Sequence, residues 1–227
     1  MKSGLKNIAI DTELQNIGRF FLIGIAEMKK ISAPYDFYHG PFMFFASGFE
    51  RLFKVCLCLD YLRKNSSHLE DHTKLWSQKK GHDLVFLKDS LIDNLNLRES
   101  YIFTSDANYF IKNDIFKKII KTLSEYGNRG RYFDLDQIFG KTQSYNINEE
   151  WNELEHYVLK KSFGMNYLNK YVNDPNQLFV DSRNLIIENI SRGLNYVHYL
   201  FEKGALKEFY IYYGHHLIIL KNIDTLA

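Results

Sequence analysis

Acidic and basic side chains recur along the sequence at spacings that could form one binding site. Glu50 and Lys54 are four residues apart, which places them on the same face of a helix that is otherwise rich in phenylalanine. A carboxylate among aromatic side chains is costly to bury unless it meets a cation or a hydrogen-bond donor. His82-Asp83 and Arg131 follow later in the chain. We expect these five residues to form a polar cluster that binds a ligand.

Members of this cluster also have a purely structural explanation. Glu50 and Lys54, in this order, form a common pair on helix surfaces that contributes only about 0.3 kcal/mol. His82-Asp83 stands where a helix is expected to begin, and an aspartate there accepts hydrogen bonds from the free N–H groups of the first turn. The sequence therefore leaves open whether Asp83 binds a ligand or caps a helix.

The histidines and the common cofactor motifs do not indicate a metal or nucleotide cofactor. The sequence has neither a Gly-rich loop followed by Lys-Ser or Lys-Thr nor a His-Glu-x-x-His sequence. His68 and His72 have i,i+4 spacing, but no carboxylate and third histidine follow in a recognisable metal-binding pattern. His215-His216 is the other concentration of histidines. We expect no metal ion and no other cofactor.

Taken in order, three segments resemble the HEPN superfamily: Ser47–Lys54, Lys79–Leu84 and Gly127–Asp136. In that family a small residue, a Glu and a Lys share one helix, a His-Asp-Leu sequence opens the next helix, and an Arg-Tyr pair follows later. The resemblance covers about residues 41–136 and closes with a helix over 181–202. It implies an up-and-down bundle of four to five helices, often homodimeric, with additional N-terminal and C-terminal helices in this chain.

Many HEPN proteins are similar to one another in cleaving RNA without a metal, in toxin–antitoxin, abortive-infection and CRISPR-linked defence systems. Their motif is Arg-x(4–6)-His, in which the histidine moves a proton and the arginine stabilises charge on the phosphate while the RNA 2′-OH attacks. The resemblance implies that Arg192 and His198 are the catalytic pair. Arg63 and His68, in the break after the second predicted helix, form a second match to the motif.

The first of these motifs departs from the family at Gly193, where a polar residue is usual. On a straight helix Arg192 and His198 lie about 120° apart and about 9 Å along the axis. They converge only if a kink at Gly193 or a second subunit brings them together. The alternative is that Arg192 is solvated and His198 packs against an aromatic face.

The elements that must position these residues are helices. Only three prolines occur, apolar residues recur at helical spacing, and no stretch alternates convincingly as a half-buried strand. We expect an all-α bundle of about six to eight helices that forms a single domain over residues 1–227. Helix starts are expected near the following residues, with an ordered loop over 128–146 and a stop at Gly204: Asp11, Pro41, Gly81, Ser105 or Asp106, Asn148 and Asp181.

Charge and composition limit the classes of partner. A net charge of +2 argues against charge-driven, sequence-blind binding of nucleic acid. One predicted helix nevertheless has a cationic side that either tracks phosphates or is merely solvated, made of Lys112, Lys117, Lys118 and Lys121. No apolar stretch is long enough to span a membrane, and no signal peptide is apparent. Cys56 and Cys58 are expected to be buried thiols, and we expect a cytoplasmic protein.

Three functional hypotheses follow from the sequence. The first is a dimeric HEPN-type endoribonuclease that acts on RNA and is paired with a cognate antitoxin or another partner protein. The second is a non-catalytic HEPN-like module that binds nucleotides or a partner protein through the polar cluster. The third is a structural, oligomerising helical protein, for which 18 Phe, 16 Tyr and 2 Trp supply core and interface area.

Overall fold

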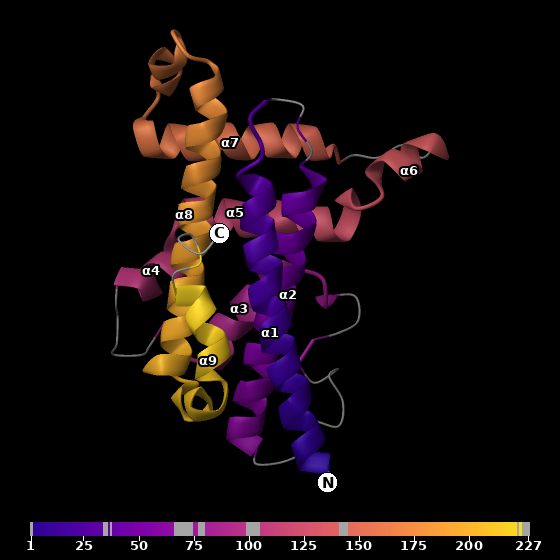
Figure 1. The fold of residues 1–227 in the computed structure, drawn as a ribbon, viewed down its shortest axis with the longest axis vertical. Helices are drawn as coiled ribbons and strands as arrows, with labels where there is room; N and C mark the ends of the chain where they lie inside the picture. The colour runs from indigo at the N-terminus through magenta and orange to yellow at the C-terminus, as the bar shows by residue number, and fades with distance from the viewer. Residues whose placement is uncertain are drawn as a thin grey trace.

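The computed structural model describes residues 2–33, 36, 38–65, 75–76, 80–98, 105–140, 145–221 and 223, with the backbone alone at 2–5, 134 and 135. Within these ranges every regular element is helical, which confirms the all-α prediction (Figure 1). The α-helices are α1 (Lys2–Met28), α2 (His39–Asn65), α3 (Leu84–Asn94), α4 (Ser105–Lys112), α5 (Asp114–Glu125), α6 (Phe133–Ile138), α7 (Ile147–Phe163), α8 (Asn176–Glu202) and α9 (Tyr210–Lys221). Single-turn segments are η3 (Tyr126–Gly130), η4 (Tyr167–Tyr171) and η5 (Lys207–Phe209).

Helices α1 and α2 form the longest pair, and they run antiparallel side by side (Figure 1). The apolar stripe predicted for each helix is buried against the other. The ring of Phe21 meets the ring of Phe49 edge to face at 4.9 Å. The two helices approach closely at Gly48, where an added Cβ would lie 3.0 Å from Phe21. Aromatic packing therefore fixes the face of α2 from which Glu50 and Lys54 project.

The second half of the bundle is built on α8, which packs along α9 and is crossed by α7 at one end (Figure 1). Helices α4 and α5 connect the two halves, because Phe110 and Phe116 reach both α2 and α8. Phe116 packs edge to face on Phe49, and Phe110 packs on Tyr196 at 5.1 Å. Helix α6 projects away from the bundle (Figure 1). Helix α3 packs against α2 and α5, which places His82 beside α2 and Lys88 beside α5.

Two predicted helix starts lie inside helices, so the predictions were wrong there. Asp11 lies well within α1, which begins at Lys2, and Asp181 lies on the second turn of α8. A capping carboxylate would accept hydrogen bonds from the backbone N–H groups of the first turn. Each of these carboxylates instead accepts from a side chain on another helical segment. Asp11 accepts from His216, and Asp181 accepts from Lys170 and Tyr171 of η4.

The single helix expected over 105–127 is two helices. Asn113 breaks it, and its side chain accepts a hydrogen bond from the backbone N–H of Phe116 at 2.9 Å, which caps α5. The loop expected over 128–146 contains the end of η3 and the short helix α6. Aspartate and asparagine occur both as caps and as helix-surface residues, so the sequence pattern alone did not distinguish these cases.

The two cysteines differ in exposure. Cys56 is fully buried and Cys58 is half-buried, so the expectation of buried thiols holds for the first. Burial raises the pKa of Cys58 to about 11 and that of Cys56 further, which keeps both thiols protonated and unreactive at neutral pH. None of the helices in the described ranges has both the length and the apolar character needed to cross a bilayer.

Candidate functional site

The first part of the candidate site is a charged group that joins α2 to the start of α3. Lys54 Nζ donates to Glu50 Oε1 at 2.7 Å, and His82 Nδ1 lies 3.0 Å from Glu50 Oε2. The Glu50 side chain is 15% exposed. Burial raises the pKa of Glu50, but the hydrogen bonds and charges of Lys54 and His82 outweigh it and hold that pKa below its ordinary value. The structure therefore brings three of the five predicted cluster residues into direct contact.

Asp83 is next to this group but its carboxylate has a structural task. Its Oδ1 accepts from the backbone N–H of Phe86 at 3.0 Å and from the hydroxyl of Ser124 at 3.2 Å. Ser124 in turn accepts from the backbone N–H of Leu84 at 2.9 Å. Asp83 thus caps α3 and fastens it to α5, so the structural alternative left open by the sequence describes this residue.

Arg131 follows η3, a π-helical turn that lies beside His82. A Cβ added at Gly127 would lie 3.9 Å from the carbonyl oxygen of His82. Arg131 itself is exposed, and no hydrogen bond or ion pair joins it to Glu50 or His82 in the described part of the chain. One residue from each segment that carries the HEPN resemblance, Glu50, His82 and Gly127, consequently lies close to the next, although Arg131 stands apart from these contacts.

A groove runs between α1 and α2 next to Glu50 and Lys54. It has a volume of about 380 Å³, and its charged lining residues are Glu13, Glu50, Arg51 and Lys54. These charges neutralise one another, since Arg51 pairs with Glu13 and Lys54 pairs with Glu50. The Lys54 ammonium also lies 5.4 Å from the centre of the Trp76 ring. The groove has no excess of either charge.

The predicted catalytic pair lies on α8 but points to two different neighbours. Arg192 faces α4, where its Nε is 3.3 Å from Asp106 Oδ1 and its guanidinium carbon is 4.2 Å from the centre of the Tyr109 ring. His198 is 2% exposed and faces α9, where its ring packs edge to face on Tyr210. Within one chain the structure does not bring Arg192 and His198 together.

The buried position of His198 limits its chemistry. Burial lowers the pKa of His198, and its Nε2 atom has no hydrogen-bond partner among the described residues. The departure from the family pattern at Gly193 has a packing reason, because a Cβ there would lie 2.4 Å from the Phe116 ring. In the second motif, Arg63 forms an ion pair with Asp60 at 2.7 Å, whereas His68 lies outside the described residues.

The second part of the candidate site is a lysine pocket between α3 and α5. Its volume is about 220 Å³ and it is lined by Val85, Lys88, Asp89, Lys117, Ile120 and Lys121. Lys88 is only 4% exposed, and its Nζ lies 5.3 Å from the centre of the Phe110 ring. In the described part of the chain, Lys88 has neither an ion pair nor a hydrogen bond. It is a buried cation whose acidic neighbour, Asp89, is outside ion-pair distance.

The electrostatics of this pocket follow from that burial. Burial lowers the pKa of Lys88 from its ordinary 10.5 to about 8, the charge of Asp89 partly opposes this, and those of Lys117 and Arg98 add to it. A ligand with negative charge would reverse the effect. Two of the four lysines on the predicted cationic helix side, Lys117 and Lys121, line the pocket. Lys118 instead pairs with Glu153 at 3.2 Å.

Sequence reasoning missed Lys88, although a pattern could have found it. Leu84, Leu87 and Leu91 form the buried stripe of α3, and Lys88 is four residues from Leu84 within that stripe. A lysine on the buried side of a helix is rare because a buried charge needs compensation. Its position in an apolar stripe is therefore the observation that marks it.

Comparison with known proteins reveals no relative of this chain. No protein-family model, no curated protein and no solved structure matches it. The functional conclusion therefore rests on the geometry of the two charged groups, one with paired charges and one with a lysine that has no ion pair among the described residues.

Proposed function

We propose that this protein binds RNA, and that the lysine pocket between α3 and α5 receives a phosphate of the RNA backbone. The observation that carries the proposal is Lys88, a 4% exposed cation with no anionic partner among the described residues. A phosphate oxygen would supply the missing charge and accept hydrogen bonds from the ammonium group. Lys117 and Lys121 line the same pocket and add positive charge.

Two further observations favour RNA among the carriers of phosphate. The pocket also has apolar walls, since Val85 and Ile120 contribute to its lining, which suits a sugar or base next to the phosphate. The segments around His82 resemble the HEPN superfamily, in which RNA is the usual substrate. A net charge of +2 fits a compact site more than an extended cationic surface.

The test compares RNA binding by two lysine variants. Fluorescence anisotropy of a labelled single-stranded oligoadenylate would be measured with the wild type, with Lys88→Met and with Lys118→Met. Lys88→Met keeps the unbranched shape and most of the length of the side chain and removes its charge, and we expect it to weaken binding at least about tenfold. Lys118→Met is the matched control, because Lys118 is already paired with Glu153, and we expect a change below about twofold.

Two outcomes of the comparison between the variants would contradict the proposal. One is equal loss of affinity in both variants, which would indicate a general effect of charge. The other is wild-type affinity in Lys88→Met. Inorganic phosphate and an oligodeoxyadenylate, added as competitors, separate RNA binding from general anion binding, and competition by phosphate at an equal concentration would contradict RNA as the ligand.

A second candidate function is metal-independent RNA cleavage of HEPN type, and His82 is the residue that favours it. Its ring is held through Nδ1 by Glu50, and the side chain is 58% exposed, so Nε2 is open to a substrate. A carboxylate that accepts from Nδ1–H leaves Nε2 free to take a proton, as a general base for a 2′-OH requires. Lys54, on the other side of Glu50, would supply positive charge to the scissile phosphate once it exchanges its contact with Glu50 for the phosphate.

Cleavage is tested with total RNA in the presence of EDTA, using His82→Ala and His198→Ala. We expect His82→Ala to abolish cleavage without loss of stability, since the side chain is exposed. If the predicted pair Arg192 and His198 is catalytic in an assembly of two chains, His198→Ala abolishes cleavage and His82→Ala does not. Unchanged cleavage by both variants would contradict both assignments, and no cleavage by the wild type would exclude this second candidate.

A further inference from the structure

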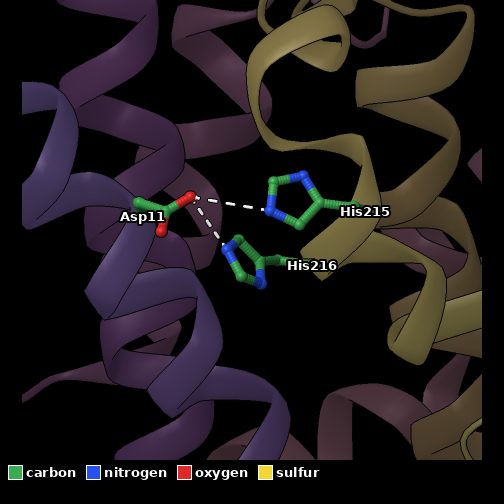
Figure 2. A group of neighbouring side chains, drawn as sticks. All are labelled: Asp11, His215 and His216. Atoms are coloured by element: carbon green, nitrogen blue, oxygen red, sulfur yellow. Dashed lines mark hydrogen bonds and ion pairs between the residues drawn. The ribbon is translucent and has the colours of Figure 1, made fainter.

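Three side chains that can bind a metal ion meet where α1 packs on α9, away from the sites described above. Asp11 lies on α1, and His215 and His216 lie on α9 (Figure 2). The Nε2 atom of His216 is 2.8 Å from Asp11 Oδ1, and the Nε2 atom of His215 is 3.8 Å from the same oxygen. One ligand atom from each of the three residues lies within 4.8 Å of the other two. Figure 2 shows both imidazoles turned toward the carboxylate.

This convergence is unusual for adjacent residues of one helix. Successive helical side chains point about 100° apart, so neighbouring histidines normally face different surroundings. Here the two ring centres are only 3.9 Å apart. The hydrogen bond to Asp11 accounts for His216, which is largely buried. It does not account for His215, which is 64% exposed and would be hydrated equally well elsewhere.

The donor set and its spacing suit a divalent transition metal. Two neutral imidazoles and one carboxylate are a common ligand set for zinc, which binds nitrogen and oxygen at about 2.0–2.2 Å in tetrahedral sites. Tetrahedral ligands at that bond length are separated by about 3.3 Å. The separations of 2.8 and 3.8 Å from Asp11 Oδ1 lie on either side of this value. Small side-chain rotations, chiefly of exposed His215, would therefore complete the site.

A fourth position has space and polar neighbours. A pocket of about 250 Å³ adjoins Asp11 and is lined by Asn7, Ile8, Tyr212 and Tyr213. The hydroxyl of Tyr213 donates to Asn7 Oδ1 at 3.5 Å. Three protein ligands beside an open pocket are the arrangement in which zinc keeps a water molecule or another small ligand in its fourth position.

We propose that Asp11, His215 and His216 bind one zinc ion whose fourth position opens on the pocket next to Tyr212 and Tyr213. The site joins the first helix of the chain to the last. Binding therefore stabilises the contact between α1 and α9, because an ion that binds the folded chain and not the unfolded chain shifts the folding equilibrium. This proposal is independent of the RNA-binding proposal, since the residues and the measured quantity are different.

The test measures zinc binding to the full chain, freed of metal with a chelator. Isothermal titration with zinc chloride would be compared for the wild type, His215→Gln, Asp11→Asn and His82→Gln. We expect one zinc per wild-type chain and a melting temperature that rises by about 5–10 °C at zinc 100-fold above Kd. His215→Gln and Asp11→Asn should each weaken binding at least about tenfold. Magnesium, which prefers an octahedral set of oxygen ligands, should not reproduce the shift.

His82→Gln is the matched control, because His82 is a histidine of similar exposure that also touches a carboxylate. It should bind zinc as the wild type does. His215→Gln is the decisive variant, since its exposed position allows the fold to survive the change, and circular dichroism would check this. Wild-type affinity in His215→Gln, a loss confined to His82→Gln, or no zinc binding by the wild type would each overturn the proposal.

Discussion

The two charged groups next to α3 differ in how their charges are balanced. At the start of the helix, Glu50 is held between Lys54 and His82, and its pKa is lowered by these partners. One turn further along, Lys88 is buried against an aromatic ring and other lysines, and its pKa is lowered by burial. In the first group the protein satisfies its own charges. In the second, no described residue forms an ion pair with Lys88.

This difference indicates which group gains more from a ligand. The contacts with Lys54 and His82 already offset much of the cost of burying the Glu50 carboxylate, so a bound anion would compete with existing contacts. A buried ammonium without a partner retains the cost of its burial, and a phosphate would remove that cost. We therefore propose the lysine pocket as the anion site, and the Glu50 group as the support of the His82 ring.

The largest expected effect is a gain of stability on removing the Lys88 charge. A pKa lowered from 10.5 to about 8 corresponds to a cost of roughly 3 kcal/mol at neutral pH, at about 1.4 kcal/mol per pKa unit. Lys88→Met should therefore raise the free energy of unfolding at pH 7 by about 1–3 kcal/mol. Urea unfolding measures it. A destabilised Lys88→Met would mean that the protein already compensates the charge.

The pH dependence of the free energy of unfolding provides a second test of the difference between the Lys88 group and the Glu50 group. Lys88 has a pKa of about 8 in the folded chain and 10.5 in the unfolded chain, so the unfolded chain binds more protons between these values. Stability should therefore rise with pH from about 8 to 10.5 because of this residue. Other groups titrate in this range, so the wild type is compared with Lys88→Met. Parallel pH profiles of the two proteins would contradict the account.

The salt dependence of RNA binding tests whether the neighbouring lysines belong to the pocket. Lys117→Gln and Lys121→Gln each remove one cation from its lining. If both contact phosphates, each variant should lower the slope of log affinity against log salt by about 0.7. Lys118→Met, whose charge is paired with Glu153, should leave the slope unchanged. If all these proteins had the same slope of log affinity against log salt, the RNA phosphates would contact neither Lys117 nor Lys121.

The smallest expected effect belongs to the balanced group. Glu50→Gln removes the charge that pairs with Lys54 and His82 and should destabilise the fold by about 0.5–1.5 kcal/mol at pH 7. The pKa of Glu50 is lower in the folded chain than in the unfolded chain, so the wild type loses this stabilisation as the pH falls below about 4.5. The free energies of unfolding of the wild type and Glu50→Gln should therefore become similar at low pH. Thermal melts at both pH values measure this. A larger penalty at low pH would be inconsistent with the pairing.

The sequence predicted the fold better than the site. The buried faces of α1 and α2 were predictable because apolar residues recur at helical spacing along the sequence. The structure buries these residues. The Asp83 cap followed from local chemistry that needs no tertiary contact. The partner of Asp11 and the lack of an anion beside Lys88 could be learned only from the tertiary structure. The partner of Asp11 is 205 residues away on α9, and the isolation of Lys88 depends on what α5 places beside it.

The most direct test of the account is the pKa of the Lys88 side chain, measured by NMR on the isotope-labelled protein with and without oligoadenylate. Lys88→Met identifies the resonance. The account predicts a pKa near 8 in the free protein and a rise toward 10.5 when RNA is bound, because phosphate favours the charged ammonium. An ordinary pKa in the free protein, or a lowered pKa that RNA leaves unchanged, would contradict it.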